Sequence, residues 1–340
     1  GLGDTLAGTF SGLTQRAPIE ATVEVTRMAL ETGADTLVGV GGSTISDAAR
    51  MIGVMMALEI TTVDRLRELS REHDGVLPAD LVSSQLPWQV SIPTTLSAGE
   101  FNMGGGNILD DRAGHKIRVR HPGLYAHLIV LDPEMTVGTP DWLWFSTGVK
   151  ALDHCIERLY TTGNQPAIDA PILSAAEMLF NDLARSGESH HDLDARLRCL
   201  MAAWMSMMGA PNFNTGLSHA IGHVIGVRYA VGHGYTSCVT QPYVMEYNRP
   251  VSAAKQALLA RSAGIDTRGM SDEAAAEAAA RAVDDLILGM GMPHRLRELE
   301  IPREDLPAIA EEVLHDRPAQ TNAIPITREE QVMEVLEKAF

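Results

Sequence analysis

A strand followed by a glycine turn and a helix limits the folds that this chain can adopt. Residues 36–40, TLVGV, are small, apolar and partly β-branched, as expected of a buried strand. They run directly into GGSTISDAARMIGVMMA, which opens with turn glycines and continues with a helical apolar period. Further candidate strands at 88–92 and 126–131 alternate with helical stretches. This alternation predicts an α/β domain with a doubly wound, mostly parallel sheet.

Local signals refine this first domain. The segment from Glu20 has apolar residues at helical spacing and ends at Gly33, where a left-handed helix stop is easily formed. Glycines at 104–106 and the polar run at 110–114 indicate turns, and the second predicts a hairpin in ILDDRAGHKIRV.

The sequence changes character after Asp132-Pro133. Long segments with a helical period dominate from there on, at 143–160, 167–186, 195–208 and 253–288. A chain of 340 residues also exceeds the roughly 250 to 300 residues that one hydrophobic core usually serves. We therefore expect an α/β domain at 1–138 and an all-α domain at 139–340.

Composition excludes several classes of partner. A formal net charge of -17, without a cluster of lysine and arginine, argues against nucleic acid or an anionic membrane surface. An anionic substrate would need basic residues gathered locally. The three cysteines, Cys155, Cys199 and Cys238, share no metal-finger spacing and are odd in number, so we expect a reducing, cytoplasmic setting without disulfides. No apolar run reaches the ~18 to 20 residues of a membrane span.

Two loops are candidates for binding a nucleotide. Gly41, Gly42, Ser43 and Asp47 lie where a strand meets the amino end of a helix, and backbone N-H groups there can bind phosphate. The pattern is neither GxGxxG nor a P-loop, so a plain structural turn is an equal alternative. The second loop is PTTLS, with Thr94, Thr95 and Ser97, which on its own also reads as an ordinary capped loop.

Three histidines gather in NTGLSHAIGHVIGVRYAVGHG, residues 214–234. His219 and His223 are four residues apart, so both imidazoles project from one helix face, and His233 follows Gly232, where that helix should have ended. Neutral imidazoles could bind zinc or iron, whereas each histidine alone could be a core residue. The metalloprotease glutamate is missing, so hydrolysis is not indicated, and proton relay is a further role.

A fourth candidate is the helix that carries Lys150, His154 and Arg158 at i, i+4 and i+8. A solvated stripe paired with Asp153 and Glu157 is the simple alternative. The preceding run WLWFSTGV is apolar, which favours a buried site for this helix.

Four ordered motifs, VGGSTISDAAR, IPTTLSAGE, TGVKALDHCIERLY and GLSHAIGHVIG followed by GHG, resemble the iron-containing alcohol dehydrogenase superfamily, which includes the maleylacetate reductases. The resemblance covers essentially the whole chain. It implies a dinucleotide-binding domain, a helical domain, an active site between them, an NAD(P)H cofactor and a homodimer. Relative to that family residue 1 lies inside the first domain, and we expect the natural protein to contain the strand and helix that precede it.

The resemblance also implies roles for individual residues. Val40 and Arg50 depart mildly from the family pattern at the first motif. The positions that would contact the cofactor are Gly41, Gly42, Ser43, Asp47, Thr94, Thr95, Ser97 and Lys116.

The main departure from the family concerns its metal. Metal-dependent members hold the ion with an Asp and three His, and those positions read Lys150, His154, His219 and His233 here. An ammonium beside a metal ion is strongly repelled, so we expect no metal. Maleylacetate reductases also lack that Asp, and AGTFSGLTQRAPIEATVE and HCIERLY favour their branch, although the usual His before the proline is replaced near Arg16.

The sequence therefore predicts an NAD(P)H-dependent, metal-independent reductase of maleylacetate or a related small anionic oxo acid. Lys150 would stabilise the substrate electrostatically, His219, His223 or His154 would supply the proton, and His233 completes the catalytic set. One alternative is a metal-dependent alcohol or aldehyde dehydrogenase that uses iron or zinc through a displaced ligand set. A second is a catalytically silent nucleotide-binding or assembly protein.

Overall fold

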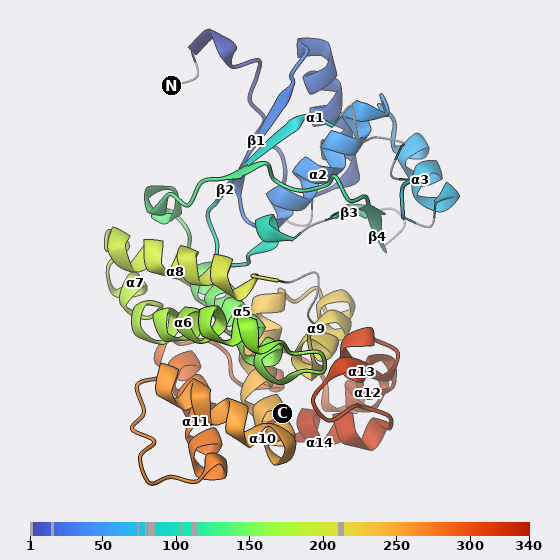
Figure 1. Cartoon of the computed structure of the whole chain (residues 1–340). Coiled ribbons are helices and arrows are strands. Elements are labelled where there is room, and N and C mark those ends of the chain that lie inside the picture. The colour runs from blue at the N-terminus through green and yellow to red at the C-terminus, as the bar shows by residue number, and fades with distance from the viewer. Residues whose placement is uncertain are drawn as a thin grey trace. The chain divides into compact units, whose positions relative to one another are not determined.

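The computed structural model describes residues 3–14, 17–73, 75–78, 80, 86–102, 104–110, 115–209 and 214–340, except the side chains of residues 115 and 116. The chain divides into two compact units, which Figure 1 draws with their elements labelled. The first unit comprises Gly1–Thr94 and Ala98–Met135, and the second comprises Thr95–Ser97 and Thr136–Phe340.

The first unit contains a parallel sheet with the strand order β1-β2-β5 and a separate antiparallel pair, β3-β4. The predicted α/β class with a parallel sheet is confirmed. The elements up to the unit boundary are η1 (Gly3–Thr5), α1 (Ile19–Thr32), β1 (Thr36–Gly41), α2 (Ser43–Ala57), α3 (Val63–Glu72), β2 (Trp88–Pro93), η2 (Gly99–Phe101), β3 (Gly105–Asp110), β4 (His115–Arg120), β5 (Leu128–Ile129) and η3 (Pro133–Thr136).

Local sequence explains most of these elements. Gly33 ends α1 in the left-handed conformation, with φ 68°, as expected. The strand predicted at 126–131 is reduced to two residues, and Gly105 and Gly106, predicted as a turn, are part of β3. The predicted hairpin strands are present, whereas its turn at 111–114 lies outside the described residues.

Helix α2 packs against the sheet along β1, and α1 packs against α2. A Cβ at Gly39 would lie 3.1 Å from Cγ2 of Ile45, so strand and helix approach closely at this glycine. Alternate residues of β1, Val38 and Val40, are exposed, as are Trp88 and Leu128. Helix α2 therefore covers the other face of the sheet.

Helices are the regular elements of the second unit in its described part, which confirms the predicted helical domain. Its elements are α5 (Asp141–Tyr160), α6 (Pro166–Asp182), α7 (Arg185–Glu188), α8 (Leu193–Ser206), α9 (Leu217–Arg228), α10 (His233–Ser262), α11 (Asp272–Gly289), η5 (Leu296–Leu299), η6 (Arg303–Asp305), α12 (Leu306–Leu314), α13 (Arg317–Thr321) and α14 (Glu329–Ala339).

Two helix predictions in this unit are wrong in detail. The single helix expected at 253–288 is divided between α10 and α11, because Gly264 and Gly269 adopt left-handed φ values of 76° and 78° between them. The helix expected at 167–186 is likewise divided into α6 and α7. Among the described residues, none of the helices combines the length and the apolar composition needed to cross a bilayer.

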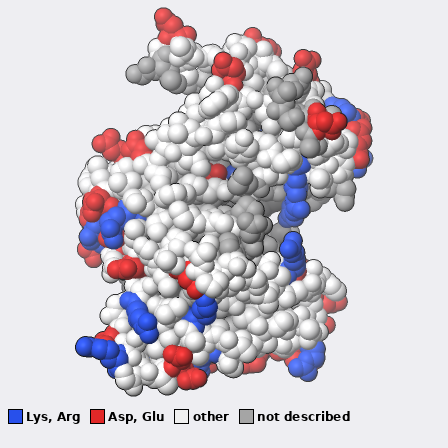
Figure 2. Space-filling model, in the orientation of Figure 1, with Lys and Arg blue, Asp and Glu red and all other residues white. Residues whose placement is uncertain are grey.

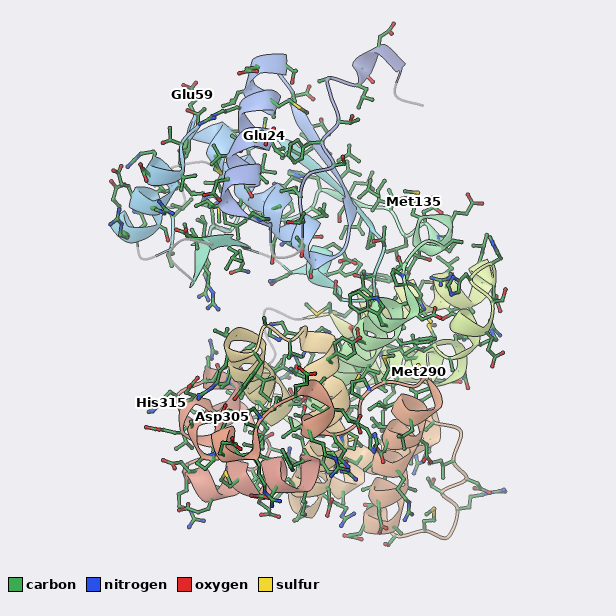
Figure 3. The ribbon with its side chains drawn as sticks, turned by 180° about the vertical axis from the view of Figure 1, so that it is seen from behind. Glu24, Glu59, Met135, Met290, Asp305 and His315 are labelled. Carbon is green, nitrogen blue, oxygen red and sulfur yellow. The ribbon has the colours of Figure 1, made fainter. Side chains whose placement is uncertain are left out.

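Helix α5 lies at the centre of the second unit's packing. It contacts α6, α8 and α10, and nearly all its residues from Trp144 to Tyr160 are buried. The side chains of the two units are drawn in Figure 3, with Glu24 and Glu59 labelled in the first unit and Asp305 and His315 in the second. Burial on all sides makes α5 a rigid carrier for the polar groups that it holds.

Candidate active site

Helix α5 carries Lys150 into a nearly buried position, with 12% of its side chain exposed. The ammonium Nζ donates a hydrogen bond to Asp153 Oδ2 at 2.8 Å, one turn further along the helix. The same oxygen accepts a hydrogen bond from Ser237 Oγ of α10 at 2.6 Å. The pairing of Lys150 with Asp153 that the solvated-stripe alternative expected is present, but it lies inside the protein rather than on its surface.

Asp153 is fully buried, yet it is held as a carboxylate. Burial alone would raise its pKa, but Lys150, then His219 and the hydrogen bond from Ser237, outweigh burial and leave the pKa of Asp153 below its usual value. The site therefore contains a buried ion pair between Lys150 and Asp153.

Glu157, one turn after Asp153, connects α5 to the start of α9. Its buried carboxylate accepts hydrogen bonds from the backbone N-H groups of Gly216 at 2.6 Å and Ser218 at 2.8 Å. It also binds Nδ1 of His219 at 2.6 Å. Because an ionised carboxylate only accepts hydrogen bonds, Nδ1 of His219 carries the hydrogen and Nε2 is left as an acceptor.

Arg158 belongs to a different set of contacts. It is buried, and its Nη1 donates to the carbonyl oxygen of Ser206 while Nη2 lies 3.2 Å from the sulfur of Met207. Burial lowers the pKa of Arg158 to about 10. The predicted cationic stripe is therefore divided, because Lys150 binds Asp153 whereas Arg158 binds the end of α8.

The histidines converge as predicted. Ring centroids are 5.2 Å apart for His154 and His219, 6.4 Å for His219 and His223, and 5.6 Å for His223 and His233. One detail is wrong: α9 ends at Arg228, and His233 is the first residue of the next helix, α10.

These histidines differ in protonation and access to solvent. Burial, reinforced by Arg158 and Lys150, holds the pKa of His154 well below its usual value, and burial followed by Lys150 lowers the pKa of His219. His223 is 47% exposed, and its Nδ1 lies 2.6 Å from Asp316 Oδ2. His154 and His219 are therefore neutral near pH ~7, whereas His223 connects the cluster to solvent.

Three ligand atoms of Asp153, Glu157 and His219 lie within 4.8 Å of one another and could hold a metal ion. Their contacts argue against this. Both oxygens of Glu157 bind α9, and Asp153 Oδ2 binds Lys150 and Ser237. Among the described residues, Asp153 Oδ1 is the one oxygen of the trio without a hydrogen-bond partner. In this arrangement the trio does not fit the three or four protein ligands of a zinc or iron site.

The glycine turn of the first unit lies at the amino end of α2, where backbone N-H groups could bind a phosphate. Gly41 has φ 153°, and a Cβ there would lie 2.4 Å from Cγ1 of Ile45, so a larger residue would be strained and would displace the Ile45 side chain. Gly42 is the extended N-cap residue, and Ser43, the first residue of α2, is exposed. Asp47, predicted to contact the cofactor, forms a 2.8 Å ion pair with Arg50.

The second predicted cofactor loop is shared between the units. Thr94 N donates to Gly41 O at 3.1 Å, which places the end of β2 beside the glycine turn. The hydroxyls of Thr95 and Ser97 lie 3.0 Å apart and belong to the second unit, where Leu96 N donates to Thr147 Oγ1. Lys116 lies opposite Leu109 in the hairpin, but its side chain is outside the described part. Arg16 is also outside it.

Sequence reasoning missed the buried roles of Asp153, Glu157 and Ser237. The two acids were considered only as partners of a solvated stripe. Their apolar neighbours in LDHCIERL were the available signal, because charges on such a helix face other polar groups inside the protein. Ser237 gives no signal of its own.

Models of known families identify the chain. The iron-containing alcohol dehydrogenase model matches residues 2–133, and the C-terminal model of the Fe-containing alcohol dehydrogenase family matches residues 144–340. The chain belongs to the iron-containing alcohol dehydrogenase family. As a member of this family it is an oxidoreductase.

Individual relatives agree with this assignment. The dehydrogenase ALT3 of Alternaria alternata is 30% identical, over 98% of this chain and 91% of its own. A crystal structure of a 1,3-propanediol oxidoreductase superposes with a TM-score of 0.86 at 26% identity, covering 98% of this chain and 84% of its own. Maleylacetate reductase from Agrobacterium tumefaciens shares the fold, with a TM-score of 0.77 at 22% identity over 98% of this chain and 82% of its own. The maleylacetate branch is thus one neighbour among others.

Proposed function

We propose that this member of the iron-containing alcohol dehydrogenase family is a metal-independent, NAD(P)H-dependent reductase of maleylacetate or a related small oxo acid. The observation that carries the proposal is the buried ion pair of Lys150 and Asp153, 2.8 Å apart, beside the neutral His154 and His219. By the resemblance of its motif TGVKALDH to the family, Lys150 takes the position at which metal-dependent members have an Asp ligand. Its charge replaces that of the metal.

The proposed mechanism assigns each residue a limited task. A bound reduced nicotinamide supplies a hydride. The glycine turn and the amino end of α2 bind the cofactor phosphates through backbone N-H groups. Hydride addition to a carbonyl carbon, or to an alkene conjugated with it, moves the π electron pair onto oxygen, and the Lys150 ammonium stabilises that developing charge. A proton then completes the product.

The proton is best supplied through His223. His154 and His219 are buried and neutral, and Nε2 of His219 is an acceptor. His223 is half-exposed, and its Nδ1 lies 2.6 Å from Oδ2 of Asp316. His223 can therefore take a proton from solvent and pass it into the cluster.

A substrate panel tests the proposal directly. Purified protein is assayed with NADH and NADPH against maleylacetate, related oxo acids and short aldehydes, before and after chelation. We expect cofactor oxidation with an oxo acid, unchanged by the chelator, and no stoichiometric iron or zinc on metal analysis. The expected homodimer is measured on the same sample by light scattering.

The metal-dependent alternative makes the opposite prediction. An alcohol or aldehyde dehydrogenase with a displaced ligand set would contain a stoichiometric ion and lose activity on chelation. One observation favours this alternative. Among the described residues, Asp153 Oδ1 is buried without a hydrogen-bond partner, so it is available as a metal ligand. A silent nucleotide-binding protein would bind NADH and reduce none of the compounds in the panel.

Lys150→Asp restores the family's carboxylate ligand and removes the ammonium. We expect metal-free turnover to fall ~100-fold, the cost of removing one charge-stabilising group. Added Fe²⁺ or Zn²⁺ should then restore part of the activity. Lys150→Met, which has no ligand charge, serves as the control and should lose activity without gaining metal dependence. Unchanged, metal-free activity in Lys150→Asp would contradict the proposed role of Lys150.

A further inference from the structure

The side chain of Lys150 is held by two residues that the family pattern does not assign. A lysine side chain has four rotatable bonds and in solution samples many rotamers. Here its Nζ is fixed by Asp153 Oδ2 at 2.8 Å, and that oxygen is fixed in turn by Ser237 Oγ at 2.6 Å. The contact from α10 thus restrains the carboxylate, and the carboxylate restrains the ammonium.

Packing makes this arrangement rigid. Asp153 and Ser237 are both fully buried, and α5 packs against α10. At Gly234, one turn before Ser237, a Cβ would lie 2.5 Å from the carbonyl oxygen of Ser146 in α5. The two backbones therefore meet directly at this point, which fixes the position of Ser237 relative to Asp153.

An ordinary structural ion pair does not explain one feature of Asp153. Buried carboxylates in stable pairs usually have both oxygens satisfied, because an unpaired buried acceptor is costly. Among the described residues, Asp153 Oδ1 is buried without a partner, although Oδ2 accepts two hydrogen bonds. The carboxylate is thus oriented so that Oδ2 binds Lys150 and Ser237, while Oδ1 is left without a hydrogen bond among the described residues.

We propose that Asp153, oriented by Ser237, is a positioning residue that holds the Lys150 ammonium in its working place. This inference rests on the proposed function, in which that ammonium stabilises the substrate oxygen. Arg158 cannot take over the task, because its guanidinium is engaged with Ser206 and Met207.

Lys150→Ala permits a test that is independent of any substrate. The truncation leaves space for three carbons and the ammonium, so the probe is n-propylammonium, measured by calorimetric titration. We expect binding to Lys150→Ala and at least ~10-fold weaker binding to Lys150→Ala/Asp153→Asn, because a hydrogen bond to a charged group is lost. Neutral n-propanol should bind both variants equally.

A matched control uses a neighbouring acid that does not contact Lys150. Asp316 binds His223, so Lys150→Ala/Asp316→Asn should retain the amine binding of Lys150→Ala. Thermal unfolding of all three variants checks that each is folded. Equal amine binding with and without Asp153, or no amine binding to Lys150→Ala, would overturn the positioning role.

Activity separates this inference from the proposed function. With the best substrate of the panel, n-propylammonium should restore turnover to Lys150→Ala but not to the variant that also lacks the Asp153 carboxylate. Full activity of Lys150→Ala without amine would refute the role of Lys150 itself. An inactive Lys150→Ala whose amine binding and rescue do not depend on Asp153 would refute only the positioning role.

Discussion

Glu100 is a buried acid of the first unit, in the short helix η2 that follows the PTTLS loop. It is 3% exposed, and among the described residues its Oε2 has no hydrogen-bond partner. Burial raises the pKa of Glu100 to about 7, against a smaller opposing effect of Arg50. Arg50 itself binds Asp47 and the carbonyl oxygen of Gly99, so it only partly compensates the acid.

The raised pKa predicts that stability falls as pH rises. Between about pH 4.5 and pH 7 the folded protein keeps a proton on Glu100 that the unfolded chain has lost, so the free energy of unfolding decreases across this window. The loss is on the order of 3 kcal/mol and is complete above about pH 7. The Glu100→Gln variant should not show this pH-dependent loss of stability. Denaturant unfolding at about pH 5 and pH 8 measures the difference, and parallel pH profiles for both proteins would contradict the prediction.

At the scale of elements, the contact of α5 with α10 sets the geometry of the site. The Cβ that Gly234 lacks would also lie 2.6 Å from the carbonyl carbon of Ser146, so the close approach involves backbone that cannot rotate away. Any residue larger than glycine must separate the two helices. Both His233 and Ser237 are on the same stretch of α10 and would move with it.

Gly234→Ala should therefore reduce activity and stability together. Overpacking of a buried contact costs about 1 to 3 kcal/mol, and the displacement should lower kcat more than ~10-fold because the charged groups lose their alignment. Gly289→Ala, in a helix with nothing within 4 Å of the added methyl group, is the control and should be neutral or slightly stabilising. Thermal unfolding and steady-state kinetics are measured on both variants. Equal Tm and kcat values for the two would show that the close approach of α5 and α10 is unimportant.

Sequence periodicity predicted the elements better than their polar contacts. The strand and helix around Gly41 and the long helix around Lys150 follow from local patterns that leave little choice. The division between α10 and α11 was missed, because alanine-rich helical periods on both sides conceal two left-handed glycines. The partner of Glu157 was missed for a different reason: it lies about sixty positions further along the chain, and no local pattern encodes a contact at that separation.

At the scale of the whole molecule, the acidic excess is the dominant property. The formal net charge is -17, and the face in Figure 2 carries acidic and basic side chains in small scattered groups rather than one basic field. Such an excess destabilises a compact state through self-repulsion. Lys150 therefore has to attract an anionic substrate against the overall negative field of the protein. Its buried position helps, because a buried charge is screened less by solvent.

Screening this repulsion should stabilise the protein. We expect Tm to rise when the salt concentration is raised from about 20 mM to about 500 mM, because the Debye length falls several-fold over that range. Sodium and potassium chloride should act equally, since the effect is non-specific. A Tm that stays constant or falls in both salts would mean that self-repulsion is negligible at pH ~7.

The hydrogen bonds from Gly216 and Ser218 to Glu157 couple fraying of the first turn of α9 to the orientation of His219. The N-cap residue of α9 supplies no side-chain cap. Its first turn is held by Glu157 of α5, which binds the Gly216 and Ser218 N-H groups and sets the tautomer of His219, and by Asn322, which binds the Leu217 N-H group. Fraying of that turn and loss of the imidazole orientation are thus a single event. Amide hydrogen exchange at Ser218 would report, without substrate or cofactor, the fraction of molecules in which the histidine cluster is intact.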